Sequence, residues 1–306
     1  MPERLGDWGL VLLAAVCALG AGGVWLVMAA AILVQALPAI QAFGGAFLVG
    51  AVWDPVQGEY GIGPPLWGTL VTTGLALGLA VPLGLGVAIG LAEPWPWLRP
   101  GWQRWGAALV EVLAAIPSVV YGLWGIFVLM PALRAWQKWQ PQWFGGETIG
   151  PSVGVASLVL AIMVVPTVAA VARSSLQQVP QTYRWAAAAL GATRWDILLG
   201  IVLPAARLGI GGGILLALAR ALGETMAVAM LIGNAHRWPR SLWQPGSTLP
   251  SLLANQFAEA QGMQVAALMY AALVLLGVTI GIHLAARWLW PNHSPGIDNG
   301  RESRLG

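Results

Sequence analysis

The stretch Leu218–Asn234, LARALGETMAVAMLIGN, places an arginine and a glutamate four residues apart in an otherwise apolar run. Between Arg207 and Arg237 the chain carries no other formal charge. About 20 mainly apolar residues suffice to cross the hydrocarbon core of a bilayer. A charge at the centre of that core costs about 2.5–3.5 kcal/mol on insertion scales. The stretch therefore predicts a membrane-spanning helix in which Arg220 and Glu224 need partners or water.

The composition of the whole chain agrees with a membrane protein. Of its 306 residues, 58% are hydrophobic and 9% are charged, and the mean hydropathy is +0.73. Soluble domains are usually about 25% charged. In a membrane protein the distribution of basic residues among the loops matters more than the net charge, which is +3 here. This net charge therefore does not indicate a nucleic-acid partner. The only cysteine, Cys17, excludes an intramolecular disulfide.

Long segments without charge predict the other spans. Such runs lack the alternating pattern of barrel strands, and a helix satisfies its own backbone polar groups in hydrocarbon. We therefore expect an all-α integral membrane protein. Its six helices are expected to be centred near Val24, Leu79, Val120, Ala161, Leu222 and Leu275.

Basic residues predict the orientation of these spans. With six spans both termini share one side, and cytoplasmic loops are enriched in lysine and arginine. Four basic residues fall on the side opposite the termini: Arg134, Lys138, Arg237 and Arg240. The side of the termini holds ten: Arg4, Arg99, Arg104, Arg173, Arg184, Arg194, Arg207, Arg287, Arg301 and Arg304. We expect a multi-pass protein of the bacterial inner membrane with both termini in the cytoplasm.

The predicted cytoplasmic loop 174–206 contains its own secondary-structure signals. Pro180 can begin a helix, the alanines that follow favour one, and Gly191 can end it in the left-handed conformation. We expect two short helices joined at a bend. One interpretation is a hairpin lying on the lipid headgroups. The other is a helix presented to a groove on a cytoplasmic partner.

The spacing of this loop resembles the EAA loop of ABC-importer permeases, which reads E-A-A, three residues, G, nine residues, I-x-L-P. The resemblance implies that the loop docks on a separate ATP-binding subunit. Trp185 stands where the family usually has glutamate. The matching positions are Ala186, Ala187, Gly191, Ile201, Leu203 and Pro204.

A wider resemblance runs from Phe47 to about Glu259 and points to the PstC-type permeases of bacterial phosphate importers. The order and spacing of six segments carry it. They are FLVGAVWDP from Phe47, GTLVTT from Gly68, LAAIPSVVYGLWG from Leu113, LAIMVVPT from Leu160, LGATRW from Leu190 and RALGETMAVAMLIGN from Arg220.

This resemblance implies a fold and a set of partners. The fold would be the six-helix bundle of type I, MetI-like ABC-importer permeases. We expect an N-terminal helix and periplasmic segment in 1–65, a five-helix core in 66–287 and a disordered cytoplasmic tail in 288–306. The implied partners are a sister permease, two ATP-binding subunits, a periplasmic phosphate-binding protein, inorganic phosphate and the lipid bilayer. No cofactor is expected in this chain, because the partner subunit binds ATP.

A P-loop needs a lysine after its glycine turn, and the only lysine here, Lys138, lies in WQKWQ. The chain is therefore expected to be a non-catalytic subunit. A G-x-S-x-G pattern at 150–154 matches the nucleophile elbow of hydrolases, but that elbow joins a strand to a helix and this one opens a predicted span.

Arg220 and Glu224 have two interpretations. Four residues apart on one helix face, they can form a structural salt bridge. Alternatively, the guanidinium binds phosphate oxygens while the carboxylate accepts the proton that hydrogen phosphate still carries. Thr225, Ser118 and Tyr121 complete the expected substrate pathway, the latter two beside a helix break at Pro117. A proton-coupled secondary anion carrier could use the same pair, but it would not need the EAA loop.

Overall fold

The computed structural model describes residues 3–93, 100–139 and 149–289. Within these ranges the regular secondary structure is helical apart from one antiparallel hairpin of two short strands, and loops such as 232–248 join the elements. The chain divides into two compact units. The first unit comprises residues 1–76, 117–161 and 222–278, and the second comprises residues 77–116, 162–221 and 279–306.

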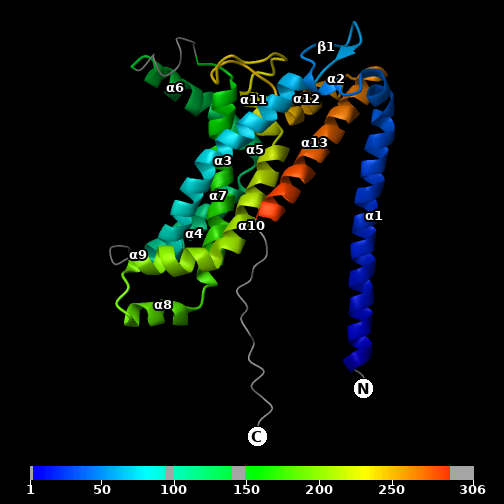
Figure 1. Cartoon of the computed structure of the whole chain (residues 1–306). Helices are drawn as coiled ribbons and strands as arrows, with labels where there is room; N and C mark the ends of the chain where they lie inside the picture. The colour runs from blue at the N-terminus through cyan, green and yellow to red at the C-terminus, as the bar shows by residue number, and fades with distance from the viewer. Residues whose placement is uncertain (1–2, 94–99, 140–148, 290–306) are drawn as a thin grey trace. The chain divides into compact units, whose positions relative to one another are not determined.

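The first unit contains the hairpin and several short helices (Figure 1). Its complete elements are α1 (Glu3–Phe43), α2 (Ala46–Val49), β1 (Trp53–Asp54), β2 (Glu59–Tyr60), α5 (Ser118–Trp124), a π-helical stretch (Gly125–Leu129), α6 (Met130–Gln137), α11 (Met226–Leu231) and α12 (Leu249–Gln256). Parts of α3 (Gly63–Ala92), α7 (Val153–Gln177) and α13 (Met263–Leu289) also belong to it.

The second unit contains the remaining parts of those three helices and nearly all of α10 (Leu203–Gly223). It also holds α4 (Pro100–Ala115), α8 (Gln181–Ala189), α9 (Arg194–Ile197) and a π-helical stretch (Leu198–Val202). Figure 1 shows α8 returning beneath α9, so that the two form a short helical hairpin.

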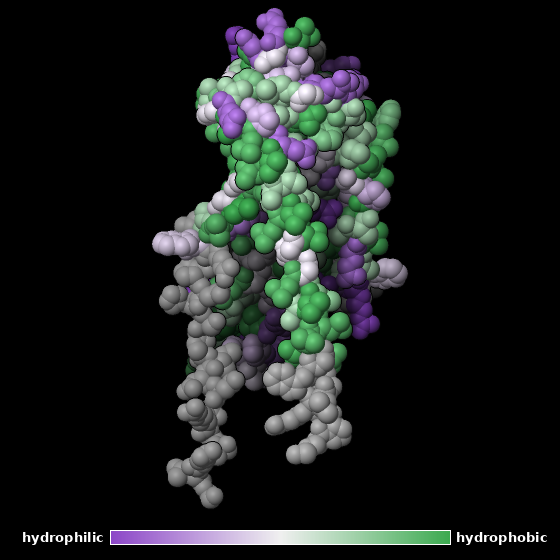
Figure 2. Space-filling view, turned by 90° about the vertical axis from the view of Figure 1, so that its right-hand side faces the viewer, coloured by the Kyte–Doolittle hydropathy of each residue, from purple (hydrophilic) through white to green (hydrophobic). Residues whose placement is uncertain are grey.

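The six predicted spans are confirmed by length and composition. Six helical stretches in the described ranges are long and apolar enough to cross a membrane: 10–43, 63–92, 118–137, 153–177, 194–223 and 263–286. Many of their large apolar side chains are exposed, as Figure 2 shows on the face that it draws. The stretch 290–306, most of the predicted tail, lies outside the described residues, and α13 continues to Leu289.

Two predicted spans are interrupted. The sequence indicated the interruption at Pro117 but not the one at Glu224. The third is broken at Ile116–Pro117, between α4 and α5, because a proline cannot donate the helical hydrogen bond. The fifth is broken at Glu224–Thr225, between α10 and α11. The two π-helical stretches end just before Pro131 and Pro204, where the missing N–H groups disturb the regular hydrogen-bond register.

An aromatic core surrounds the hairpin in the first unit. Phe47 stacks on Tyr270 with ring centroids 4.4 Å apart, and Trp53 meets Tyr60 edge-on across the hairpin. The Nε2 of His236 donates a 2.9 Å hydrogen bond to the Gly61 carbonyl, since that oxygen can only accept. Burial lowers the pKa of the His236 imidazole, although this hydrogen bond opposes the shift. The loop after α11 is thereby joined to the segment after β2.

Glycine allows α7 and α10 to approach closely in the second unit. A Cβ added at Gly209 would overlap the Ser175 Oγ and lie 2.7 Å from the Ser175 Cβ. One turn further along α10, a Cβ at Gly213 would lie 3.0 Å from Val171. At Gly212, on another face of the same helix, an added Cβ would meet nothing within 4 Å. The packing of α10 on α7 therefore depends on Gly209.

We predict that Gly209→Ala destabilises the purified protein and that Gly212→Ala does not. Overpacking a close contact costs typically about 1–3 kcal/mol, whereas alanine is the better helix former at an open position. The measurement is the thermal unfolding midpoint of each variant in detergent. Equal midpoints for the two variants would contradict the close contact between α7 and α10.

Candidate functional site

The bend that presents α8 is formed by local sequence. Pro180 precedes α8 with φ −57° and ψ 136°, and Gly191 beyond its C-terminus has φ +85°. This left-handed conformation is accessible to glycine at little cost. Thr193 then caps α9, since its side chain accepts from the Asp196 N–H while the Asp196 side chain accepts from the Thr193 N–H. The two short helices and the bend predicted from the sequence are confirmed.

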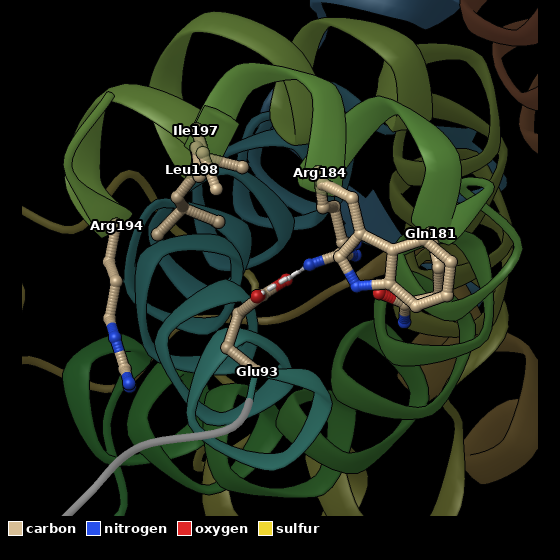
Figure 3. Close-up of a pocket in the computed structure, with 8 residues that line it drawn as sticks. Glu93, Gln181, Arg184, Arg194, Ile197 and Leu198 are labelled. Carbon is tan, nitrogen blue, oxygen red and sulfur yellow. Dashed lines mark hydrogen bonds and ion pairs between the residues drawn. The ribbon is translucent and has the colours of Figure 1, made fainter. Parts of the chain in front are cut away.

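A partly buried ion pair joins α8 to the end of α3. The Nη1 of Arg184 donates to the Glu93 carboxylate, 2.6 Å from Oε1 and 2.5 Å from Oε2. Its Nη2 donates to the Leu176 carbonyl at 3.0 Å. The side chains of Arg184 and Glu93 are 11% and 14% exposed, and Figure 3 shows them pointing toward one another. The pair therefore joins α8, α7 and the residue that follows α3.

The sequence alone does not reveal this pair. Glu93 and Arg184 are 91 residues apart, and no periodic pattern links positions on different helices at such a separation. Only the sequence position of each residue was informative. Glu93 is the charge that ends the second apolar run, and Arg184 directly precedes Trp185 in the predicted loop. The capping box at Thr193, in contrast, was readable from its threonine and the aspartate three residues later.

A cavity of about 300 Å³ lies beside the ion pair (Figure 3). Part of its wall is apolar and comes from Ala188 on α8, Ile197 on α9 and Leu198 in the π-helical stretch. The other residues that line it are Glu93, Gln181, Arg184, Trp185 and Arg194. Arg184 and Trp185 therefore bring adjacent positions of α8 to the same cavity.

The α8–α9 hairpin exposes large apolar side chains. Trp185 is 68% exposed and Leu190 is 89% exposed, and Tyr183 and Trp195 are also exposed. Of the other residues predicted for the loop, Ala186 and Gly191 are exposed and Ala187 is buried. Ile201 lies in the π-helical stretch, and Leu203 and Pro204 begin α10. The predicted loop residues thus form one continuous structural element, although they do not share one surface.

The expectation that Arg220 and Glu224 share one helix face is wrong. Helix α10 ends at Gly223, and Glu224 lies in the break that follows. Its Oε1 accepts a 3.1 Å hydrogen bond from the Ala227 N–H, which satisfies one of the unpaired N–H groups at the start of α11. The neighbouring Thr225 donates to the Gly223 carbonyl at 3.1 Å. Capping of α11 therefore holds Glu224 outside the helical register of Arg220.

The first unit brings α5 against α11. A Cβ added at Gly122 would lie 2.8 Å from the Met230 Sδ and 3.3 Å from the Ala227 Cα. Ser118 begins α5 directly after the Pro117 break, and Tyr121 is buried one turn later. Two predicted pathway residues thus lie on a helix that packs against α11, the helix that Glu224 caps. Arg220 belongs to the second unit, where it is half-buried in the last turn of α10.

No cluster of three or more histidine, cysteine, aspartate or glutamate side chains suited to a metal ion occurs in the described part of the chain.

Comparisons with known proteins give one family. Residues 80–289 match the family described as binding-protein-dependent transport system inner membrane component. The phosphate transport system permease protein PstC of Haemophilus influenzae is 39% identical over 262 residues, which is 81% of each chain. That of Pasteurella multocida is 41% identical, covering 81% of this chain and 80% of the relative. The probable PstC of Methanocaldococcus jannaschii is 34% identical, covering 83% and 85%.

Solved structures show a similar fold. An inward-facing form of the MetNI methionine ABC transporter aligns with a TM-score of 0.58 at 19% identity, covering 78% of this chain and 97% of that chain. A bacterial ABC transporter for the acidic polysaccharide alginate aligns with a TM-score of 0.54 at 16% identity, covering 87% and 94%.

Proposed function

This chain belongs to the family of binding-protein-dependent transport system inner membrane components, and we propose that it is the PstC-type permease subunit of an ATP-driven phosphate importer. The observation that carries the substrate assignment is the identity of 39% to a PstC protein over 81% of each chain. The chain forms half of the pathway for inorganic phosphate and performs no ATP hydrolysis itself. Its lipid-exposed apolar helices suit a multi-pass subunit of the inner membrane.

A permease subunit that forms half of the pathway and does not hydrolyse ATP needs partners. Two copies of an ATP-binding subunit supply the energy, a homologous sister permease completes the pathway, and a periplasmic binding protein delivers phosphate. The α8–α9 hairpin is the element that meets the ATP-binding subunit. Its exposed Trp185 and Leu190 suit a protein interface, because large apolar side chains contribute most when a partner covers them. The partly buried Glu93–Arg184 pair attaches α8 to the end of α3, so that a movement of the hairpin is transmitted to the membrane helices.

The phosphate pathway uses the helix breaks. A helix N-terminus presents unpaired N–H groups and a partial positive charge to an anion, and both α5 and α11 begin at a break. Ser118 and Tyr121 contribute hydroxyl groups from α5, and Thr225 contributes one beside α11. Glu224 uses one carboxylate oxygen to cap α11 and can accept a phosphate proton with the other. Arg220 attracts the anion with its planar guanidinium.

Both termini lie in the cytoplasm, and the hairpin 53–60 faces the periplasm, because the basic residues are biased toward the side of the termini. We predict that a cysteine at Val56, 96% exposed, reacts with a membrane-impermeant maleimide from outside in a Cys17→Ala background. The measurement is labelling of intact spheroplasts compared with inverted vesicles. Labelling from the cytoplasmic side alone would reverse the topology.

We predict that Gly191→Val uncouples transport. Its φ of +85° is strained for a β-branched residue, so the hairpin would lose its bend while the membrane helices stay intact. The measurement is phosphate uptake per ATP hydrolysed in the reconstituted complex. Gly200→Val is the matched control, since an added Cβ there meets nothing within 4 Å and the backbone is helical. An unchanged ratio in Gly191→Val would contradict the coupling role.

We predict that Arg220→Lys lowers phosphate uptake at least about tenfold, because an ammonium keeps the charge but cannot supply a planar, bidentate fork. Arg207→Lys, at an exposed position of the same helix, should transport normally. The measurement is ATP-dependent uptake into proteoliposomes, normalised to assembled complex. Normal uptake in Arg220→Lys would remove Arg220 from the pathway. Uptake that follows a proton gradient and ignores ATP would instead indicate a secondary carrier.

A further inference from the structure

We propose that the cavity beside α8 receives an uncharged apolar side chain of the ATP-binding subunit. This inference rests on the proposed function, in which the α8–α9 hairpin meets that subunit. It adds the chemistry of the contact: an apolar group enters this chain, in place of the charge contact that a glutamate at position 185 would make. The shape of the cavity, the charges on its wall and the residue at position 185 each support it.

The size and lining of the cavity suit one large side chain. Its volume of about 300 Å³ is at the lower end of the range for small-molecule pockets. Ala188, Ile197 and Leu198 supply apolar atoms from three successive elements of the hairpin. Removing apolar surface from water against such a wall favours association. An aromatic or branched aliphatic side chain would bury the most apolar surface against this wall.

The charges around the cavity disfavour a cationic occupant. The Glu93 carboxylate is already engaged by Arg184, so it offers no uncompensated negative charge to an incoming lysine or arginine. Arg194 also lines the cavity. A cation would therefore lose hydration without gaining a partner, and that loss is costly. The ion pair thus selects against a positively charged partner group as well as supporting α8.

Trp185 fits this chemistry and a glutamate would not. The indole lines the cavity and extends outward, 68% exposed, where a docking partner would cover it. Aromatic side chains are favoured in the buried centres of protein interfaces, where acidic residues are depleted. A glutamate at this position would have to be desolvated when a partner docks. Tryptophan at position 185 and the engaged Glu93 are therefore parts of one apolar contact.

The test fills the cavity and compares it with a matched change outside it. Ala188 and Ala189 are adjacent exposed alanines of α8, and only Ala188 lines the cavity. We expect Ala188→Phe to weaken binding of the ATP-binding subunit at least about tenfold and Ala189→Phe to change it less than threefold. The measurement is the Kd of that subunit for the complex of this chain with its sister permease, held in nanodiscs. Equal affinities for the two variants would overturn the inference.

Variants of Trp185 test the chemistry without filling the cavity. We expect Trp185→Phe to retain most of the affinity and Trp185→Glu, which restores the usual family residue, to weaken it. Tighter binding or a higher ratio of transport to ATP hydrolysis in Trp185→Glu would overturn the inference. The inference would also be overturned if Ala188→Phe weakened binding of the ATP-binding subunit and, at the same time, reduced the contact of the hairpin with lipid. An acyl chain would then be the occupant of the cavity.

Failure of the proposed function has a separate signature. If the ATP-binding subunit does not bind the wild-type nanodisc complex at all, the assignment of the hairpin as the coupling element fails. If the wild-type complex binds the subunit and hydrolyses ATP, but Ala188→Phe binds as tightly as Ala189→Phe, the hairpin assignment stands and the apolar cavity contact fails.

Discussion

A backbone N–H or C=O group inside a bilayer has no water to bond, and leaving it unpaired costs several kcal/mol. Continuous helices meet this constraint over most of the chain. At the start of two further helices, another group of the same chain supplies a missing partner. Glu224 accepts from the Ala227 N–H at the start of α11, and Thr69 accepts from the Leu249 N–H at the start of α12. At these two helix starts, a polar side chain thus supplies the hydrogen-bond partner that the helix lacks.

Buried side-chain charges are subject to the same constraint. Arg184 and Glu93 lie almost out of solvent, and breaking such a pair leaves an uncompensated charge that destabilises a protein by about 3–5 kcal/mol. The pair therefore fixes the position of α8 relative to the end of α3. Its net contribution to the free energy of unfolding is smaller than the cost of breaking it, because both charges were desolvated when it formed. For the proposed coupling to an ATP-binding subunit, such a fixed arrangement is useful, because a loosely held hairpin would absorb motion instead of transmitting it.

The two regions proposed to act in transport are built differently. In the first unit, α5 and α11 pack closely through Gly122, so Ser118 and Tyr121 are held by backbone contact. In the second unit, α8 is held by the Glu93–Arg184 ion pair, the hydrogen bond from Arg184 to the Leu176 carbonyl and the buried Ala187, and it leaves Trp185 and Leu190 exposed. Close packing suits a pathway whose polar groups must keep their spacing. An exposed, firmly attached hairpin suits a surface that a partner engages.

The amino-acid sequence by itself determined the helical class, the six spans, the bend at Gly191 and the family, because length, hydropathy and glycine placement are local properties and the family motifs keep their spacing. It also pointed to the break at Pro117. It did not determine the end of α10 at Gly223, since an apolar run looks continuous until a side chain such as Glu224 competes for the backbone. Only the tertiary structure decided that Arg184 pairs with Glu93 and that Ala188, Ile197 and Leu198 line one cavity, because contacts between distant helices depend on packing that no local pattern records.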